Sequence, residues 1–140
     1  MPSQGEGAGV RVWPWGDEWD ETRCNTRELG LGGTTPVGIF PEGASPYGCL
    51  DMAGNVWEWT ISLWGENVSE PEFRYPYDPA DGRENLEAGN EVLRVLRGGS
   101  FYNDRRSARC AYRRRLYPHG VWSDGGFRVV VFPISPASAL

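Results

Sequence analysis

Runs of apolar and aromatic residues along the chain are short, and none repeats with the period of a long helix. Residues 56–59 combine valine with tryptophan in a way typical of a strand. Residues 92–96 predict a second strand that runs into a Gly-Gly turn, and residues 126–132 (GFRVVVF) carry the clearest strand pattern. Residues 108–115 are ambiguous. The pattern therefore predicts short β-strands joined by long loops, with little helix.

The region between residues 16 and 48 has a period of neither 2 nor 3.6 residues. Glycine and proline punctuate it at positions 30, 32, 33, 36, 38, 41, 43, 46 and 48, which predicts a long ordered coil. Such a coil must still satisfy its backbone polar groups, for which bound cations and fixed turns are suitable devices. Residues 65–91 form a second loop, which is acidic and also carries proline and glycine.

Composition separates this chain from a disordered one. Its 140 residues include 19 Gly and 11 Pro, a share that by itself suggests disorder. They also include 7 Trp, 6 Tyr and 5 Phe, and disordered segments are poor in such residues. The length suits one domain with a single modest core. We predict a loop-rich domain over residues 11–132, with residues 1–10 as a flexible lead-in and residues 133–140 as a tail.

The net charge of −5 is unevenly spread along the chain. Residues 94–128 hold nine arginines against Asp104 and Asp124, a local charge of +7, so the remainder carries −12. A basic cluster is one signature of nucleic-acid binding. We favour the alternative that these arginines pair with carboxylates of the same domain, because the chain has no lysine and a planar guanidinium suits fixed pairing. We therefore expect no nucleic-acid partner.

The cysteines and the apolar runs bound the environment of the protein. Cys24, Cys49 and Cys110 fit neither a disulfide framework nor a CxxC metal site, and we expect reduced, buried thiols with at most one bridge. No apolar run approaches the roughly 18 residues of a membrane span. Residues 1–10 are Gly-rich and weakly acidic, unlike a signal peptide. We expect no membrane partner, and a cytoplasmic location by default.

Six short motifs follow one another in a characteristic order. They are WPWGD at residues 13–17, TTPVG at 34–38, YG at 47–48, DMAGNVWEW at 51–59, VLRGGS at 95–100 and GFRV at 126–129. This succession resembles the formylglycine-generating enzyme (sulfatase-modifying factor) family over about residues 11–131. The resemblance implies an α+β fold of the C-type-lectin-like kind, mostly irregular coil with short antiparallel strands.

Compared with the family that it resembles, the sequence lacks the usual N-terminal part. Its members normally carry an opening strand, helices and a motif similar to RLPTEAEWE before the WPWG segment, and this chain does not. A sheet without its first elements exposes an edge and apolar surface. We therefore expect either a partner chain that covers the missing half or marginal stability.

Catalysis in this family depends on residues that the chain lacks. The resemblance implies a copper site formed by two cysteines shortly after the GGS turn, which suits Cu(I) because copper and thiolate are both soft. Residues 99–110 (GSFYNDRRSARC) contain neither, since Cys110 matches a later structural position. His119 is the only histidine, so the three-histidine iron site of the family's sulfoxide synthases is also missing.

These absences predict a non-catalytic domain without copper. It would bind a protein or a small-molecule ligand whose identity the sequence does not give. The alternative is a sulfatase-modifying oxidoreductase, or a subunit of one, whose catalytic residues come from another chain.

The resemblance also implies a calcium site on the loop of residues 51–58. The ligands would be the Asp51 and Glu58 side chains and the Gly54 and Val56 carbonyls. Hard oxygen donors on a tight, glycine-containing loop are what Ca²⁺ requires. In the alternative interpretation, Asp51 caps a turn and Glu58 pairs with an arginine.

A second calcium site of the family would fall on residues 25–31. Asn25 and the Thr26 carbonyl match, but the acidic ligand of the family falls on or near Leu29. Glu28 could replace it after a small shift, so this second site is left open.

The segment between RGGS and GFR resembles the varied part of a particular kind of family member. Many short bacterial members are targets of diversity-generating retroelements, which vary this segment to give a binding surface. In this segment, residues that resemble a fixed framework alternate with a mixture of Tyr, Asn, Asp, Arg, His and Ser. Adaptable binding surfaces use such mixtures. The alternative is an ordinary member with a drifted active-site loop. The predicted contact residues are Phe101, Tyr102, Asn103, Asp104, Arg105, Arg106, Leu116, Tyr117, His119, Val121, Trp122, Ser123 and Asp124.

Overall fold

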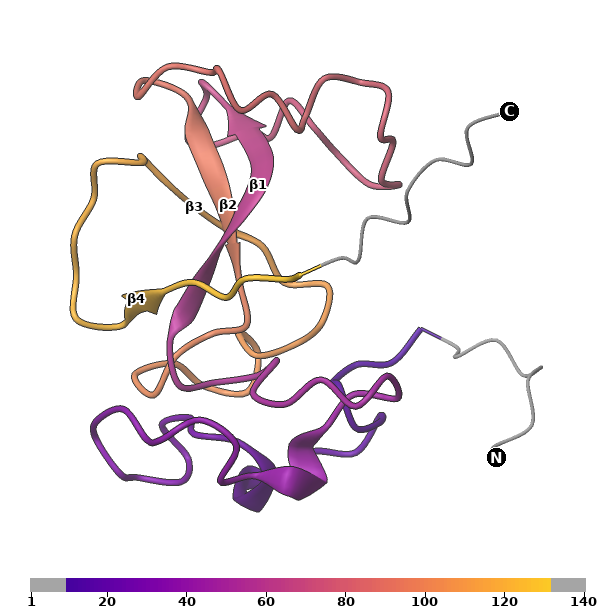
Figure 1. The fold of residues 1–140 in the computed structure, drawn as a ribbon, viewed down its shortest axis with the longest axis vertical. Helices are drawn as coiled ribbons and strands as arrows, with labels where there is room; N and C mark the ends of the chain where they lie inside the picture. Colours follow the sequence, from indigo (N-terminus) through magenta and orange to yellow (C-terminus); the bar gives the residue numbers. More distant parts are fainter. Residues whose placement is uncertain (1–9, 132–140) are drawn as a thin grey trace, which may run out of the picture.

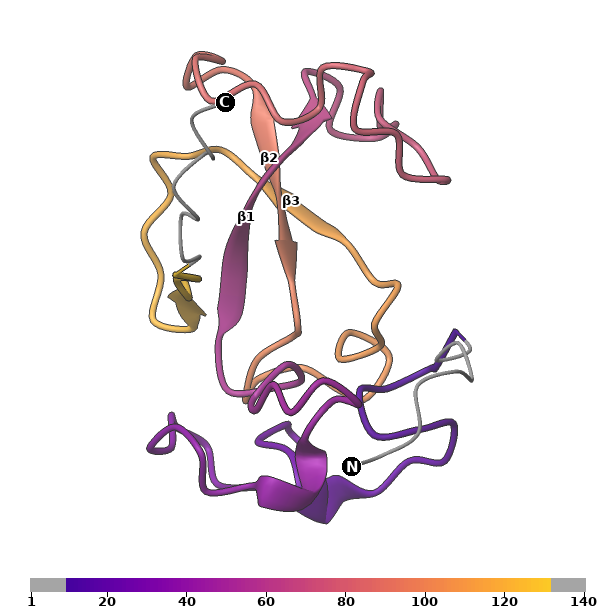
Figure 2. The same ribbon diagram turned by 45° about the vertical axis from the view of Figure 1, so that its right-hand side comes forward.

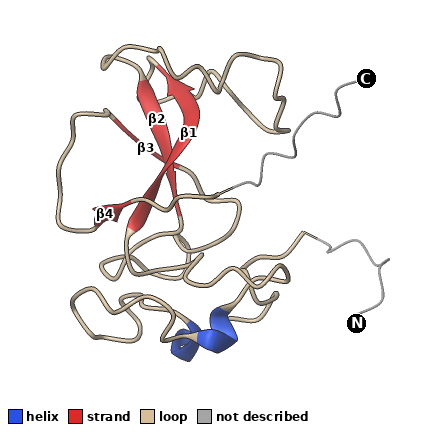
Figure 3. Ribbon diagram, viewed as in Figure 1, coloured by secondary structure: helices blue, strands red, loops and turns tan. Residues whose placement is uncertain are grey.

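The computed structural model describes residues 10–131, so the lead-in before residue 10, Phe132 and the tail lie outside the described residues. Coil dominates, as the glycine and proline pattern predicts (Figure 3). The regular elements are the short 3-10 helices η1 (Glu21–Arg23) and η2 (Pro41–Gly43) and the strands β1 (Trp57–Gly65), β2 (Leu93–Arg97), β3 (Arg114–Leu116) and β4 (Gly125–Gly126).

The four strands form one sheet in the order β3-β2-β1-β4. β1 pairs with β2 and β2 with β3 in antiparallel fashion, but β4 runs parallel to β1. The expectation of antiparallel strands is therefore wrong at this edge. The loop after β3 carries the chain along the outer side of the sheet before β4 begins, so β4 enters in the direction of β1 (Figures 1 and 2).

Two of the three predicted strands are confirmed, and the third is mostly wrong. Aromatic density around Trp57 marks β1, residues 92–96 nearly match β2, and the ambiguous segment supplies the start of β3. The predicted strand at 126–132 ends at Gly126, and Phe127 is 76% exposed. Beyond Gly126 the pairing with β1 stops, and Arg128 holds the chain through its side chain, which binds Glu58 and two loop carbonyls.

The core has an upper part inside the sheet and a lower part beneath it. Leu93 and Val95 of β2 pack with Trp64 of β1. Below the strands, the coil of residues 10–50 forms a separate layer (Figures 1 and 2). There Trp13, Trp15 and Trp19 pack on a cluster formed by the buried side chains of Cys24, Ala53 and Ala108. The tryptophans of the irregular layer thus anchor it, as expected from the composition.

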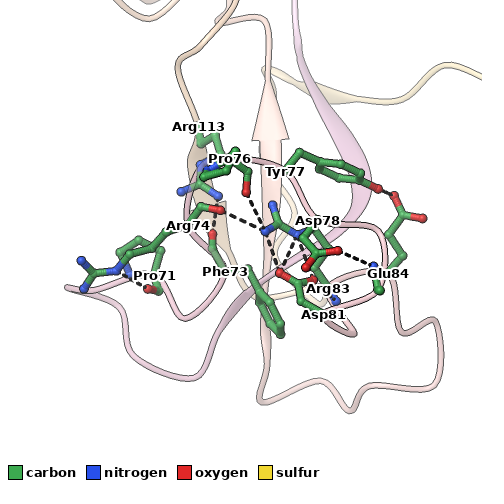
Figure 4. Close-up of polar contacts among 11 residues, drawn as sticks. Pro71, Phe73, Arg74, Pro76, Tyr77, Asp78, Asp81, Arg83, Glu84 and Arg113 are labelled. Atoms are coloured by element: carbon green, nitrogen blue, oxygen red, sulfur yellow. Dashed lines mark hydrogen bonds and ion pairs between the residues drawn. The ribbon is translucent and has the colours of Figure 1, made fainter.

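The acidic loop between β1 and β2 folds around one buried arginine (Figure 4). Arg83 is 4% exposed, and its Nη2 donates to the Asp81 carboxylate at 2.7 Å and to the Arg74 carbonyl at 2.9 Å. Hydrogen bonding to Arg83 lowers the pKa of Asp81. Arg113 reaches the same loop and donates to the Phe73 carbonyl at 2.6 Å. Guanidinium groups therefore satisfy the backbone of this loop.

The predicted pairing of the arginine cluster with carboxylates is wrong for eight of its nine members. Within residues 10–131, only Arg128 of this cluster forms an ion pair. Arg113 and Arg115 lie 5.1 and 5.0 Å from the Trp64 ring, and Arg114 lies 5.2 Å from that of Trp57. The flat guanidinium stacks on aromatic faces as readily as it pairs with acids.

We find no helix in the described chain with the length and apolarity to cross a membrane.

Candidate functional site

The loop before β1 is a tight turn fastened to the lower coil. Asp51, Gly54 and Asn55 all have positive φ, at 54°, 74° and 70°. A Cβ on Gly54 would lie 2.4 Å from the Asn25 carbonyl oxygen, so only glycine fits this approach. The Asn55 backbone N–H donates to that carbonyl at 2.7 Å, and its side-chain oxygen accepts from the Thr35 N–H at 2.9 Å. These contacts fix the predicted calcium loop.

Both acidic side chains of this loop have protein partners. Asp51 Oδ2 accepts from the Gly38 N–H at 2.7 Å. Arg128 donates through Nε and Nη2 to the two Glu58 oxygens, at 2.6 and 2.5 Å, and this pairing is the main cause of the raised pKa of Arg128. Arg128 also donates to the Leu50 and Asp51 carbonyls. The contacts of the alternative interpretation, a turn cap and an ion pair, are therefore present.

The same loop also has the donors that a calcium ion needs. Asp51, Val56 and Glu58 line one cavity of about 420 Å³, together with Arg128. Gly54, the fourth predicted ligand, is buried against Asn25 instead. Two carboxylates and a carbonyl are hard donors that suit Ca²⁺, so the residues fit the ion if Glu58 is shared between calcium and Arg128.

The second predicted calcium site has an unsatisfied oxygen at its centre. Asn25 and Thr26 are each 1% exposed, and Asn25 Oδ1 has no hydrogen-bond partner among residues 10–131. Leaving such a group unpaired costs about 1–3 kcal/mol, so a bound cation there would be stabilising. Glu28 is exposed and accepts from the Arg105 N–H at 2.8 Å. No cluster of three or more His, Cys, Asp or Glu suited to a metal occurs in the part described.

Buried hydrogen bonds tie both ends of the predicted binding segment to β1. The Ser100 hydroxyl donates to the Asp124 carboxylate at 2.6 Å. The Trp57 indole N–H donates to Asn103 Oδ1, and the Trp57 backbone N–H donates to the Asp124 carbonyl, both at 2.7 Å. Ser100, Trp57 and Asp124 are buried. Trp57 and Ser100 were not among the predicted site residues, although their place in two of the six motifs marks them.

The thirteen predicted contact residues differ in exposure. Those exposed are Tyr102, Arg105, Arg106, Tyr117, His119, Val121 and Ser123. Those half-buried are Asn103, Asp104, Leu116 and Trp122. Phe101 and Asp124 are buried, so they support the segment and do not form its surface.

The predicted contact residues fall into two groups in space. Residues 101–106 lie in the coil below the strands, and residues 117–123 lie on the loop along the outer side of the sheet (Figures 1 and 2). In the second group, the Tyr117 and His119 rings stack with centroids 5.7 Å apart. Trp122 packs on Trp59 at 5.6 Å, and its buried indole N–H has no partner among the described residues. The Ser100–Asp124 hydrogen bond joins the two groups at their base.

The fold and these motifs define a sulfatase-modifying-factor type of domain. The chain belongs to the sulfatase-modifying factor enzyme 1-like domain family, which matches residues 4–132.

Relatives with different printed names share this domain. The chain is 40% identical over 119 residues to serine/threonine-protein kinase pkn1 of Chlamydia caviae, with 83% of this chain and 17% of the relative covered. It is 33% identical over 134 residues to the mouse (Mus musculus) formylglycine-generating enzyme, with 84% and 33% covered. The chain therefore spans about a sixth to a third of the length of these relatives.

A solved structure confirms the fold. Treponema denticola variable protein 1 superimposes with a TM-score of 0.55 at 25% identity. The superposition covers 76% of this chain and 35% of that structure. The expected C-type-lectin-like fold, mostly coil around a small curled sheet, is confirmed, with the parallel β4 as its departure from the antiparallel expectation.

Proposed function

We propose that this chain is a non-catalytic binding domain that presents the seven exposed residues of segment 101–123 to a protein or small-molecule ligand. One observation carries the proposal: the buried Trp57 of β1 holds Asn103 and Asp124 near the two ends of the segment, while the seven contact residues close to these anchors are exposed. Tyr102 is 58% exposed beside Ser100, which is fully buried. Rigid aromatic area beside adaptable polar groups on a fixed scaffold is how binding surfaces are built.

The chemistry of the segment supports a binding role over an oxidase. Between Ser100 and Cys110 there is no second thiol, so two sulfur ligands for copper are not available there. The likeness to variable protein 1 of Treponema denticola adds support, since that name describes a protein that varies. The second candidate, a sulfatase-modifying oxidoreductase or its subunit, is favoured by the identity to the mouse enzyme.

An aldehyde assay separates these two functions. The purified chain is incubated with copper, oxygen and a CxPxR-type peptide, and the peptide mass is then measured. We expect the peptide cysteine to remain unchanged, because residues 100–110 hold one thiol where the copper site of the enzyme needs two. A formylglycine-generating enzyme serves as the positive control. Formation of the aldehyde by this chain alone would contradict a non-catalytic role.

We further propose that calcium at the Asp51–Glu58 loop braces the domain, with Asn25 as the centre of a second site. Calcium at one hundred times its dissociation constant should raise the free energy of unfolding by about 2.7 kcal/mol, because it binds only the native state. Thermal unfolding with calcium and with a chelator measures this difference. Asp51→Asn should abolish the gain from the first site, and Asn25→Ala that from the second. An unchanged melting temperature on chelation rules out the metal.

A further inference from the structure

A cavity of about 390 Å³ opens between the start of the domain, the loop before Asp51 and the end of β2. None of the seven exposed residues of the proposed contact segment lines it. Its lining combines apolar side chains, three arginines and two thiols, but no aspartate or glutamate. The lining residues are Val10, Arg11, Pro14, Ser45, Pro46, Tyr47, Cys49, Met52, Arg97, Gly98, Arg109 and Cys110.

The three arginines give this cavity a positive charge that no carboxylate among the described residues neutralises. Arg11, Arg97 and Arg109 form no ion pair with a carboxylate of residues 10–131. Arg97 donates to the Cys110 carbonyl at 2.7 Å and to the Tyr75 hydroxyl at 2.6 Å, which fixes its position. Arg11 and Arg109 each donate one hydrogen bond to a carbonyl and keep other N–H groups for a ligand. In a chain of net charge −5, this cluster of three arginines favours the binding of an anion.

The rest of the lining sets the chemical class of that anion. Val10, Pro14, Pro46, Tyr47 and Met52 present apolar surface, which a small inorganic ion would leave unused. The volume falls within the range of small-molecule sites. We propose that this cavity binds a small organic anion with an apolar body, such as an aromatic carboxylate or sulfonate. The anionic group would meet Arg11 and Arg109, and the apolar body would cover the proline, tyrosine and methionine surface.

Two cysteine side chains line the cavity, and their reactivity can show whether a ligand occupies it. Cys49 and Cys110 are exposed, whereas Cys24 is buried. The expectation of buried thiols is thus confirmed for Cys24 and wrong for the other two, because both lie at the cavity. Burial raises the pKa of Cys24 to about 12, so it stays protonated and unreactive. Reagents that attack thiols therefore report on Cys49 and Cys110 alone.

The first experiment compares disulfide reagents of different charge. The protein thiol loses its proton to solvent, its thiolate attacks one sulfur of the reagent, a mixed disulfide forms and the other half leaves as a thiolate. Dithiobis(nitrobenzoate) is an aromatic dianion, dithiodipyridine is aromatic and neutral, and cystamine is a dication. The rate with each reagent is divided by the rate of the same reagent with a free cysteine amide. On this scale, we expect the dianion to react about tenfold faster than the neutral reagent and the dication more slowly than the neutral reagent. Equal relative rates for the three reagents would overturn the proposal.

Substitutions test whether the cavity arginines cause this preference. The double variant R11Q/R109Q should lose most of the advantage of the dianion, because it removes two positive charges from the lining. Arg106→Gln removes one charge from the same loop as Arg109 but outside the cavity, and it should keep the preference. If the double variant does not fold, a salt titration of the unaltered protein replaces it. A preference that neither substitution nor added salt reduces would contradict binding in the cavity.

The second experiment measures occupancy by a ligand that does not itself react with the protein. Cys110 is alkylated with neutral iodoacetamide, and the rate is followed by mass spectrometry of the Cys110 peptide. Naphthoate should slow this reaction at least fivefold at saturation, because it fills the cavity. Naphthylmethanol has the same apolar body without the charge and should protect weakly. Absence of protection by naphthoate refutes the site, while a failed proposal for residues 101–123 would leave this result unaffected.

Discussion

Replacing Trp57 with alanine should lower the free energy of unfolding by about 3–5 kcal/mol, in line with Trp-to-Ala changes in buried cores. Trp57 is 1% exposed and begins β1, the strand that pairs with both β2 and β4. Its indole N–H also holds Asn103, the first anchor of the proposed contact segment. The variant therefore loses core packing and one end of that segment together. Urea unfolding followed by circular dichroism measures the change.

Two further variants separate the causes of this loss. Trp57→Phe keeps most of the ring volume and removes the N–H, which leaves Asn103 Oδ1 without its indole donor, so we expect a loss of about 1–3 kcal/mol. Tyr102→Ala removes an exposed ring near the same anchor and should change stability by no more than about 0.5 kcal/mol. If Tyr102→Ala destabilises the domain as strongly as Trp57→Phe, the division into buried framework and exposed contact surface is wrong.

Gly54→Ala should also destabilise the domain strongly, by about 2–5 kcal/mol. A left-handed backbone costs a non-glycine residue about 1–2 kcal/mol. The added Cβ would in addition lie 2.4 Å from the Asn25 carbonyl oxygen, and relieving such a clash costs about 1–3 kcal/mol. The backbone at this point cannot yield easily, because Asn55 hydrogen-bonds to the same carbonyl. The measurement is again the free energy of unfolding in urea.

Gly30→Ala is the matched control for this second change. Gly30 has nearly the same φ, 76° against 74°, but a Cβ there meets no atom within 4 Å. Gly30→Ala should therefore lose only the free energy of the unfavourable backbone angle. The difference in the free energy of unfolding between the two variants then gives the cost of the close approach to Asn25. Equal effects of the two substitutions would show that Gly54 is kept for its backbone angle only.

The sequence predicts the fold where local residue types decide the structure. Tryptophan and valine around Trp57 favour a strand on their own, and the spaced glycines and prolines disfavour α-helices between residues 16 and 48, where only two 3-10 turns form. The strand expected at 126–132 fails because strand formation also needs a partner at the sheet edge. The pairing with β1 stops at Gly126, after which Arg128 binds Glu58 through its side chain, and no local pattern reports an interaction 70 residues apart.

The sequence likewise predicts some parts of the candidate sites and not others. Motif resemblance places Asp51, Val56 and Glu58 around one cavity, because neighbours on a short loop stay close whatever the rest of the fold does. It does not show that Phe101 and Asp124 are buried, since burial depends on packing against β1. The cavity with Cys49 and Cys110 is also hidden in the sequence, where 61 positions separate the two thiols (110 − 49).

The parallel pairing of β1 with β4 sets the order in which the domain can be assembled during synthesis. Trp57 pairs with Gly125, which leaves the ribosome 68 residues later (125 − 57). Until then the edge of β1 that receives β4 stays open, and the hydrogen bond from the Trp57 N–H to Asp124 cannot form. Non-local pairings of this kind slow folding and prolong the exposure of apolar strands. A ribosome-bound chain stalled before residue 124 should therefore attract chaperones that a chain stalled well beyond residue 126 no longer binds.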